Sequence, residues 1–538
     1  YEMEGTDFLK EKAFESFFAE NEHWLSAYAA FSVLRDRNGT ANFSQWKTHS
    51  VYREDEVRRL TSPKSKGFKE IAFHYFVQYH LHLQLEEAAD YAHKKGIALK
   101  GDIPIGVYRY GCDAWMAPQL YRMDMQAGAP PDHFAVKGQN WGFPIYNWKR
   151  MQEDGFDWWK KRFQQMSHYF DAFRIDHILG FFRIWAVPVE SVEGVMGVFV
   201  PALPVPLQEF RDRGIAFDYD RFCTPFINDA VLQAEFGEHA GGVRERFLEE
   251  NSRGGYRLLP DWNTQQKVAA YFEGEEGTES AALKQGLFNL ISNVILFEDK
   301  EAAEQAFHFR ISVEDTLSFR HLDHHTQGQL KELYIHYYYY RQDGFWKKEA
   351  LRKLPALKDA THMLICGEDL GMVPHCVPDV MRDLGILSLE IQRMPKNPHT
   401  EFFHPKDAPY LSVVTPSTHD MSTVRGWWEE DRGRTQRFFN HILGEGGEAP
   451  AACAPWINRA VVLQHLYSPS MWSIFQLQDL LGMSETLRRE DPRAERINDP
   501  ANPQYYWNYR MHLTLEQLIR EKEFNRELAD YVGHSGRS

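Results

Sequence analysis

The chain is organised around residues 170–177, Phe170-Asp171-Ala172-Phe173-Arg174-Ile175-Asp176-His177, an apolar β-like run that ends in charged residues. Side chains alternate along a strand, so Ala172, Arg174 and Asp176 are predicted to share one side. The Arg174 guanidinium then lies beside the Asp176 carboxyl group and favours its ionised form. Asp176 is therefore a candidate nucleophile or metal ligand. The alternative is a structural Arg–Asp pair at the end of a strand.

Five further β-like runs share this pattern, in which a buried strand leads into a polar loop. They cover residues 97–107, 364–369, 387–393, 411–420 and 472–479. Helices alternating with buried strands are typical of an α/β fold, and a (β/α) barrel places its chemistry at the carboxyl ends of its strands. Six strands do not close an eight-stranded barrel. The sheet is therefore open, or two strands precede residue 1.

The rest of the chain is predicted to be largely helical. One helix is expected over residues 71–95, ended by Gly96. Region 190–350 breaks the strand pattern with polar helical stretches and paired glycines. We expect four parts: a helical subdomain (1–95), strands with substrate loops (96–189), an inserted, mainly helical subdomain (190–350), and further strands with a C-terminal helix (351–538).

Composition narrows the function classes. The 538 residues are 43% hydrophobic and 25% charged, as in a soluble globular protein. The net charge of -15, with no Lys/Arg-rich block, argues against nucleic acid as a partner. Five scattered cysteines without a CxxC pair suit a reducing compartment, so we expect a cytoplasmic protein. The sequence predicts no membrane span and no signal peptide, and because it starts at Tyr1 we expect the natural N-terminus upstream.

Three predicted strand ends each carry a carboxylic acid: Asp176, Glu368 and Asp420. A retaining glycosidase needs such a set, because one carboxylate attacks the anomeric carbon while an acid about 5 Å away protonates the leaving oxygen. Glu368 follows the apolar run Ile365-Cys366-Gly367, so burial near two aspartates should raise its pKa. Asp420 would then stabilise the positive charge that develops on the sugar ring.

A metal site is the competing interpretation of the same strand ends. Asp176-His177, Glu368-Asp369 and His419-Asp420 offer oxygen and imidazole ligands, as in a barrel metallohydrolase. The chain has no HExxH helix to support this interpretation. Residues 321–325, His-Leu-Asp-His-His, also look rich in ligands, but a solvated helix start explains them better.

Two loops and one aromatic run complete the set of candidate features. Residues 138–148 interleave amides with aromatic rings, including Gln139 and Trp141, which suits a sugar with an apolar face and hydroxyl edges. The alternative is a loop packed by its own aromatics. Asp113 follows the 97–107 stretch and could place a carboxylate near the same carboxyl ends of the strands as the loop 138–148. Residues 337–340, four tyrosines, are predicted to be helical with two buried and two exposed rings.

Several motifs occur in the order of a known family. They are Gly101-Asp102-Ile103-Pro104-Ile105, Asp113-Ala114-Trp115, residues 138–146, Phe173-Arg174-Ile175-Asp176-His177, Gly367-Glu368-Asp369-Leu370-Gly371 and Ser417-Thr418-His419-Asp420. This sequence strongly resembles the 4-α-glucanotransferases of glycoside hydrolase family 77, the amylomaltases or disproportionating enzymes. The resemblance covers residues 20–190 and 340–520.

The resemblance implies a (β/α)8 barrel of the TIM type in which Asp176 is the nucleophile, Glu368 the general acid/base and Asp420 the transition-state stabiliser. It implies that Arg174, His177, His419 and Asp369 contact the sugar, and that Asp113, Gln139 and Trp141 belong to substrate-binding loops. The strands of this chain would be the third to the eighth, so the first two are expected to be missing from it. Neither a metal nor an organic cofactor is implied.

The long segment between Asp176 and Glu368 departs from ordinary amylomaltases, which join these strands by a short crossover. It looks like the longer cytosolic disproportionating enzymes, which also carry starch-binding modules ahead of the barrel. That type implies transfer of glucosyl units from maltose to branched glucans such as glycogen or starch. The residues alone leave a retaining α-glucan hydrolase and a metallohydrolase as alternatives. A non-catalytic glucan-binding protein would lack at least one of the three acids, and all three are present. The residues leave the oligomeric state open.

Overall fold

The computed structural model describes residues 1, 5–132, 135–275, 277–397, 399–500, 502 and 505–537. The chain consists of two compact units. Unit 1 consists of Tyr1–Asp171 and Gly180–Met363, and unit 2 consists of Ala172–Leu179 and Leu364–Ser538. Each unit has its own buried hydrophobic clusters. Among the described residues, no helix is long and apolar enough to cross a membrane.

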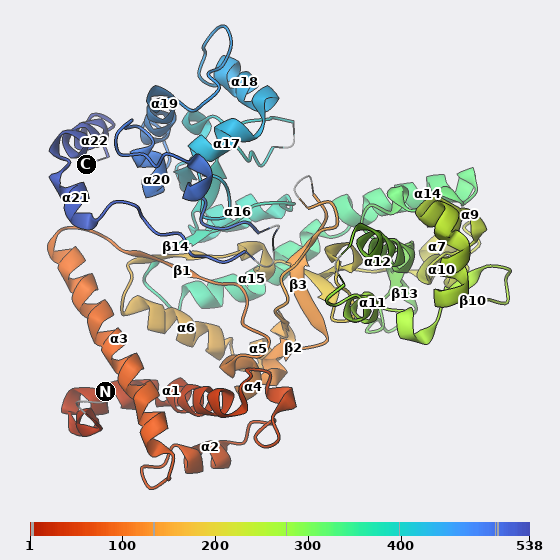
Figure 1. Cartoon of the computed structure of the whole chain (residues 1–538), viewed down its shortest axis with the longest axis horizontal. Coiled ribbons are helices and arrows are strands. Elements are labelled where there is room, and N and C mark those ends of the chain that lie inside the picture. The colour runs from red at the N-terminus through yellow and green to blue at the C-terminus, as the bar shows by residue number, and fades with distance from the viewer. Residues whose placement is uncertain are drawn as a thin grey trace. The chain divides into compact units, whose positions relative to one another are not determined.

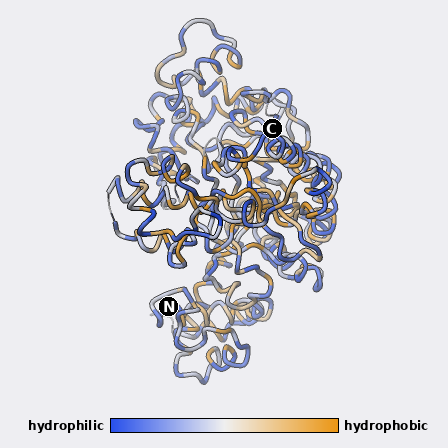
Figure 2. Tube along the Cα trace, turned by 90° about the vertical axis from the view of Figure 1, so that its right-hand side faces the viewer, coloured by the Kyte–Doolittle hydropathy of each residue, from blue (hydrophilic) through white to orange (hydrophobic). Residues whose placement is uncertain are grey.

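Two long helices, α1 (Lys12–Asn38) and α3 (Phe68–Lys94), dominate the start of unit 1 (Figure 1). Their buried faces repeat every three or four residues, as at Phe14 and Phe17 in α1. Hydrophobic and hydrophilic positions alternate along the helices near the N-terminus (Figure 2). Gly96, with φ +72°, follows α3, and the helix predicted over 71–95 is confirmed.

The short strand predicted to lead into a loop within residues 97–107 is β1 in the structure, where it covers Lys100–Ile103. Pro104 follows directly, and its missing N–H does not extend a strand ladder. Gly101 gives α6 (Asp157–Ser167) room to pack against β1, because a Cβ there would lie 2.6 Å from the Met166 methyl and 2.8 Å from the Phe170 ring.

The segment after β1 builds an antiparallel sheet in the order β4-β3-β7-β8. Strand β7 (Ile184–Pro188) pairs antiparallel with β3 (Met125–Ala129), and Ala127 lies opposite Ala186. The sheet therefore joins a loop that follows β1 to the segment that follows β6 in the sequence. The remaining elements here are α2 Glu54–Leu60, α4 Cys112–Met116, β2 Tyr121–Arg122, β4 Gln139–Asn140, β5 Ile145–Tyr146, α5 Trp148–Glu153 and β8 Val198–Val200.

Region 190–350 contains mostly helices, with two small antiparallel sheets that the sequence pattern did not predict. Strands of two to four residues are too short for an alternating pattern to stand out. Figure 1 shows these elements in yellow-green and green. They are β9 Val205–Pro206, α7 Leu207–Asp212, α8 Tyr219–Cys223, α9 Asp229–Phe236, α10 Ala240–Phe247, β10 Leu248–Glu250, β11 Tyr256–Leu258, α11 Gln265–Tyr271, α12 Thr278–Ile291, β12 Leu296–Glu298, β13 Ala306–Phe309, α13 Leu317–Arg320, α14 His324–Ile335 and α15 Asp343–Lys358.

Two local predictions in this region are confirmed. The Asp323 side chain accepts a hydrogen bond from the Thr326 backbone N–H and so caps the N-terminus of α14. Residues His336–Tyr340 form a π-helical turn, in which Tyr337 and Tyr338 are buried while Tyr339 and Tyr340 are exposed.

Unit 2 is built on five strands that run parallel among its described residues. Strand β6 (Ala172–Ile175) pairs with β14 (Leu364–Gly367), and β15 (Ser388–Ile391) pairs with β16 (Ser412–Thr415), which pairs with β17 (Trp472–Ser473). A backbone bond from Gly367 N–H to the Leu387 oxygen, 2.8 Å, connects β14 with the start of β15. Helices follow the strands: α16 Cys376–Leu384, α17 Val424–Glu430, α18 Arg432–His441, α19 Pro455–Leu466, α20 Leu477–Leu481, α21 Leu515–Arg520 and α22 Lys522–His534.

The prediction of a strand over residues 472–479 is wrong for most of its length. Only Trp472–Ser473 is a strand, and α20 begins at Leu477. The alternation at Ile474-Phe475-Gln476-Leu477 resembles a strand, but Leu477, Leu480 and Leu481 also fit helical spacing. Burial of the polar residues Gln478 and Asp479 favours the helix, since their side chains find partners in the protein.

Candidate active site

The three predicted carboxylates all lie in unit 2, just beyond the carboxyl ends of its parallel strands. Asp176 follows β6 directly, Glu368 follows β14 directly, and Asp420 lies in the loop after β16. Because β6 and β14 pair with Ile175 opposite Gly367, Asp176 and Glu368 leave the sheet side by side. This is the edge at which a (β/α) barrel carries its catalytic groups.

Arg174 lies between two of the acids. Its Nη1 is 2.9 Å from Asp176 Oδ1, and its Nη2 is 4.0 Å from Asp420 Oδ2. The Arg174 side chain is mostly buried, whereas that of Asp176 is 34% exposed. The predicted placement of Arg174 and Asp176 on one side of the strand is confirmed. One fixed cation therefore faces both aspartates and favours their ionised forms.

Glu368 is held by backbone on both sides. Its backbone N–H donates to the Ile175 carbonyl oxygen at 3.0 Å, and its backbone carbonyl oxygen accepts from the Ile178 N–H at 3.1 Å. Its carboxyl Oε2 accepts from His177 N–H at 2.9 Å, and Oε1 accepts from Leu370 N–H at 3.3 Å. His177 has φ +43°, a left-handed conformation that aims its N–H at this carboxyl.

Burial raises the pKa of Glu368 to about 7. The negative charges of Asp176 and Asp369 act in the same direction, while the positive charge of Arg174 and the His177 N–H act against it. A carboxylic acid with this pKa is half protonated near neutral pH. It can therefore both give and take a proton there, as a general acid/base must.

Asp420 has the opposite character. Burial alone would raise its pKa, but hydrogen bonding and charge from His419, a hydrogen bond from Asn498 and the charge of Arg174 hold the pKa below its usual value. His419 Nε2 lies 3.1 Å from Asp420 Oδ2, and Asn498 Nδ2 donates to Oδ1 at 2.8 Å. Asp420 is thus a fixed anion close to a protonatable glutamic acid.

A buried arginine holds the loop that carries His419 and Asp420. Arg393, just after β15, donates to the Pro416 oxygen, to Ser417 Oγ at 2.7 Å and to the Ser422 oxygen at 2.7 Å. Its side chain is buried, and burial lowers its pKa to about 10, so it stays charged at neutral pH. These bonds fasten both ends of the loop to the neighbouring strand.

Asp369 is fully buried, and both of its oxygens are engaged by the protein. Oδ1 accepts from Leu389 N–H at 2.9 Å, and Oδ2 lies 2.7 Å from Lys396 Nζ. Lys396 also lies 2.8 Å from Glu390 Oε1. Burial raises the pKa of Asp369 to about 6 despite the lysine. Asp369 follows Glu368 in the chain, but its carboxyl group is not exposed to a ligand, so the prediction that Asp369 contacts the sugar is wrong.

Asp113, Gln139 and Trp141 lie in unit 1, and all three are half-buried. Trp158 Nε1 donates to Asp113 Oδ1 at 3.1 Å, and Trp141 Nε1 donates to Gln139 Oε1 at 2.9 Å. The Trp141 ring stacks on Phe143 with 5.7 Å between centroids. The 138–148 loop is therefore ordered by contacts among its own aromatic and amide groups.

Four residues around the carboxylates were missed by the sequence analysis: Asn498, Trp507, Arg393 and Lys396. Trp507 packs against His419 with ring centroids 5.2 Å apart. The run Tyr505-Tyr506-Trp507-Asn508-Tyr509 mixes aromatics with an amide, the same signal that drew attention to residues 138–148. Arg393 and Lys396 carry no such signal, because a single cation after a strand is common.

Among the described residues, no group of three or more His, Cys, Asp or Glu side chains is placed to hold a metal ion. The ligand-rich stretch at 321–325 is accounted for by the helix cap at Asp323. The strand-end acids are instead engaged by Arg174, by His419 and Asn498, and by backbone N–H groups.

Comparisons with known proteins agree with this geometry. A family model described as 4-alpha-glucanotransferase, glycoside hydrolase family 77, matches residues 2–515. The chain belongs to this family. It is 42% identical to 4-alpha-glucanotransferase DPE2 of Oryza sativa subsp. japonica over 100% of the chain and 57% of that protein. It is also 31% identical to 4-alpha-glucanotransferase of Chlamydia muridarum over 95% of the chain and 69% of that protein.

Solved structures show that the chain has the fold of this family. The amylomaltase of Streptococcus agalactiae in complex with acarbose matches with a TM-score of 0.59 and 18% identity, over 99% of this chain and 76% of that one. This likeness implies the family's TIM-type barrel fold. The glycoside hydrolase family 77 chain described here spans little more than half the length of the rice relative.

Proposed function

We propose that this chain catalyses retaining 4-α-glucan transfer, moving glucosyl or maltooligosaccharide units between α-1,4-glucans. The observation that carries the proposal is the pairing of Asp176, beside Arg174, with Glu368, whose pKa is raised to about 7, at the ends of two paired strands. A retaining reaction needs one ionised nucleophile and one protonatable acid near a single bond. Family membership favours glucan as the substrate.

In the first step, Asp176 Oδ attacks the anomeric carbon of the donor sugar. The bond from that carbon to the bridging oxygen breaks, and its electron pair passes to the oxygen, which takes the proton of Glu368. A covalent β-glucosyl ester of Asp176 forms. Glu368 is left ionised, close to the negative charge of Asp369 and with the Arg174 cation to offset the added charge.

In the second step, the 4-hydroxyl of an acceptor sugar gives its proton to Glu368. The oxygen bonds to the anomeric carbon while the ester bond breaks and returns its electron pair to Asp176. Two inversions restore the α-configuration. A pKa near neutral lets Glu368 act as acid in one step and base in the other at the same pH.

The neighbouring residues are assigned supporting roles. Asp420, an anion with a lowered pKa, stabilises the positive charge on the ring in the transition state. Arg174, His177 and His419 bind the sugar at the cleavage point, while Asp369 with Lys396 positions the loop that follows Glu368. Asp113, Gln139 and Trp141 of unit 1 are proposed as further substrate-binding residues, since an indole and an amide suit sugars.

The proposal also includes the predictions on strand order, domain boundaries, location and substrates. Strands β6, β14, β15, β16 and β17 would be the fourth to eighth strands of the barrel, and β1 the third. The division at residues 95, 189 and 350 and a cytoplasmic location are proposed with them. We further propose maltose or maltodextrin as donor and glycogen or starch as acceptor, in line with the likeness to the rice 4-alpha-glucanotransferase.

Product analysis on maltose tests transfer directly. Transfer gives glucose together with maltotriose and longer oligosaccharides, whereas a hydrolase gives glucose alone. Retention is checked by the configuration of the newly formed glycosidic bond, which should be α when the products are examined by NMR. Glucose alone from the wild-type chain at all acceptor concentrations would reject transfer in favour of hydrolysis, and loss of activity in a chelator would favour a metallohydrolase.

Asp176→Asn tests the nucleophile. We expect turnover to fall by at least about 10³-fold, because the amide cannot form the ester, while glucan affinity stays within a few-fold. The matched control is Asp379→Asn on α16, an exposed aspartate paired with Arg382, which should keep full turnover. An active Asp176→Asn protein would remove Asp176 from the nucleophile's role.

A further inference from the structure

The segment after η11 (Pro492–Glu495) brings two side chains to the candidate catalytic cluster. Asn498 donates to Asp420, and Trp507, further along, packs on His419 with ring centroids 5.2 Å apart and a 47° interplanar angle. His419 in turn lies 3.1 Å from Asp420. Trp507 is therefore two contacts from the acid assigned to transition-state stabilisation.

Trp507 is exposed although it belongs to an anchored segment. The residue is 58% exposed, and its neighbour Tyr506 is 79% exposed. Residues 505–514 form neither helix nor strand. A large exposed indole beside a charged site is unusual, because burying an indole against protein is favourable.

Several bonds fix this segment on both sides of Trp507. Before it, Tyr505 Oη donates to the Arg496 oxygen at 3.4 Å. After it, Arg489 Nη2 donates to the Arg510 oxygen at 2.7 Å, and His512 Nε2 lies 2.8 Å from the Leu487 oxygen. The indole is thus held in place with one side against an imidazole and a large part of its surface open to a ligand. A rigid aromatic binds a ligand at a smaller entropic cost than a mobile one.

We propose that Trp507 is a stacking platform for a glucose unit of the α-glucan, next to the sugar at Asp176 and Asp420. The proposal rests on the proposed function. Glucose presents an apolar face of C–H groups that packs on an indole, and its hydroxyl edges suit the hydroxyl of the neighbouring exposed residue Tyr506. Trp507 would thereby contribute to the affinity for glucan, separately from the bond-making groups.

Binding is measured first, in the inactive Asp176→Asn background, with maltoheptaose as the probe and titration calorimetry as the readout. Trp507→Ala should weaken the affinity about tenfold, corresponding to loss of one stacked ring. Trp507→Phe, which keeps a ring, should stay within about threefold. Trp507→Gln, a polar side chain without a ring, should match the alanine variant. The melting temperature of each variant verifies that it is folded.

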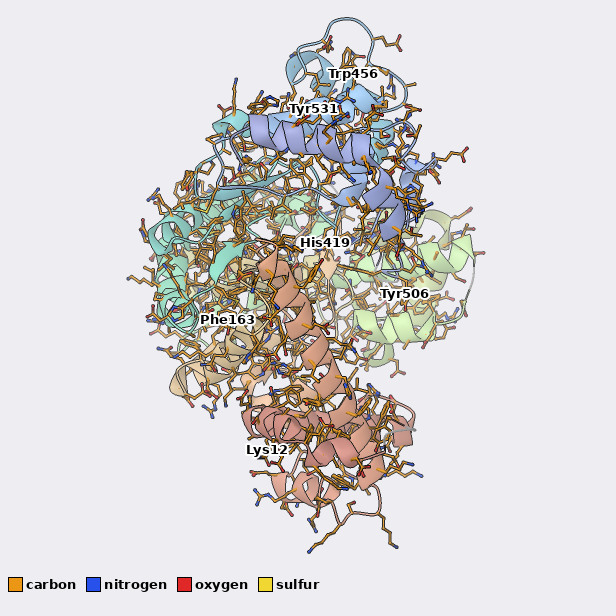
Figure 3. All side chains as sticks on the ribbon, turned by 90° about the vertical axis from the view of Figure 1, so that its left-hand side faces the viewer. Lys12, Phe163, His419, Trp456, Tyr506 and Tyr531 are labelled. Atoms are coloured by element: carbon orange, nitrogen blue, oxygen red, sulfur yellow. The ribbon has the colours of Figure 1, made fainter. Side chains whose placement is uncertain are left out.

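The matched control is Trp456→Ala. Trp456 lies on α19, is 40% exposed and packs edge-on against Phe439, well away from His419 in Figure 3. Its removal should leave maltoheptaose affinity unchanged. Loss of affinity in Trp456→Ala as large as that in Trp507→Ala would overturn the assignment.

Kinetics on the active chain separate stacking from a merely structural role. A platform predicts a raised KM for maltodextrin in Trp507→Ala, with the alanine effect partly rescued by Trp507→Phe. A fall in kcat with unchanged KM and affinity would overturn the proposal, since it would show that Trp507 only positions His419. If the wild-type chain makes no transfer products yet its glucan affinity depends on Trp507, the platform stands and transfer fails. If the wild-type chain makes transfer products but its glucan affinity does not change in Trp507→Ala, the proposed function stands and the stacking platform is rejected.

Discussion

At the scale of single residues, the proposed chemistry depends on a buried acid placed between charges of both signs. Glu368 has a raised pKa because it is buried next to Asp176 and Asp369, and Arg174 keeps it from rising further. The same burial makes its ionised form costly for the folded protein. Its stability should therefore depend on pH in a way that can be measured without any substrate.

The free energy of unfolding of the wild type should fall as pH rises from about 4.5 to about 7 because of Glu368. An acid whose pKa is higher in the folded than in the unfolded protein contributes its full stabilisation at pH values below the unfolded-state pKa. This contribution is lost as the pH rises through the folded-state pKa. The rise of the Glu368 pKa to about 7 corresponds to a change of about 3 kcal/mol in the free energy of unfolding. Glu368→Gln has no charge to bury, so its stability relative to wild type should rise by about this amount between pH 4.5 and pH 8. Urea unfolding at both pH values measures it.

Glu516→Gln on the exposed start of α21 serves as the control, because it should show the same difference from wild type at both pH values. A Glu368→Gln protein whose advantage does not grow with pH would mean that Glu368 is ionised in the folded protein already at pH 4.5. That result would remove the basis for its role as general acid.

Asn498 should act on Asp420 through its 2.8 Å hydrogen bond. Asn498→Ala removes a donor that helps to lower the pKa of Asp420, so that pKa should rise and the acidic limb of the pH–activity profile should move to higher pH. We expect kcat/KM to fall about tenfold at neutral pH. Asn525→Ala, on exposed α22, is the matched control. An unchanged profile in Asn498→Ala would show that the bond has no catalytic effect.

At the scale of elements, unit 2 joins short strands to loops that are fixed by buried charges. The loop after β16 is held by Arg393 from the end of β15, which meets two carbonyl oxygens and a hydroxyl. Gly367, the last residue of β14, leaves no space for a side chain, because a Cβ would lie 2.8 Å from Ile178 and from Met381. Glu368 is therefore positioned by the close approach of the segments on either side.

Arg393→Ala should destabilise the chain by about 3–5 kcal/mol, because it leaves carbonyl oxygens unpaired and opens a cavity. Arg393→Lys keeps the charge, but one ammonium group cannot reach Pro416, Ser417 and Ser422 as the guanidinium does. The lysine variant should remain folded with turnover at least about tenfold lower. Denaturant unfolding and transfer assays measure the two effects.

The control for Arg393 is Arg437→Ala on α18, which removes an exposed ion pair with Glu401 and should leave the denaturant midpoint nearly unchanged, because solvent screens exposed charges. Wild-type turnover in Arg393→Lys would show that the loop holds Asp420 in place without this clamp.

At the scale of the whole molecule, unit 2 is made of two separate pieces of chain. Its strand β6 comes from Ala172–Leu179, while the other strands come from Leu364–Ser538. Parallel neighbours need a crossover connection, and the chain supplies it with the whole of Gly180–Met363. Asp176 and Glu368 therefore follow neighbouring strands of one sheet only because the chain returns to unit 2 after residues 180–363.

A chain of residues 364–538 alone should aggregate, because the edge of β14 that β6 covers would be open. Residues 170–179 joined ahead of residue 364 by a flexible linker of about 20 residues should restore a soluble monomer, since a crossover needs a dozen residues or more. Size-exclusion chromatography and cooperative unfolding distinguish the two. A monomeric, cooperatively folded 364–538 chain would contradict the dependence on β6.

The sequence by itself determined the family and the three carboxylates. It did so because these depend on short motifs at the ends of strands, such as Phe173-Arg174-Ile175-Asp176-His177, whose pattern of side chains is visible without the fold. It also predicted the helix over 71–95, which rests on local periodicity. It misjudged residues 472–479, where local alternation fits a strand and a helix equally and burial decides for the helix.

Only the tertiary structure decided the pKa values and the positions of these carboxyl groups. The pKa of Glu368 depends on burial and on Arg174, far away in the sequence, and Asp420 depends on Asn498, 78 residues later. Arg393 and Trp507 likewise act on a loop that lies far from them along the chain. Burial and electrostatic fields arise from packing between distant segments, so a local motif identifies the candidate acids while the fold sets their protonation and position.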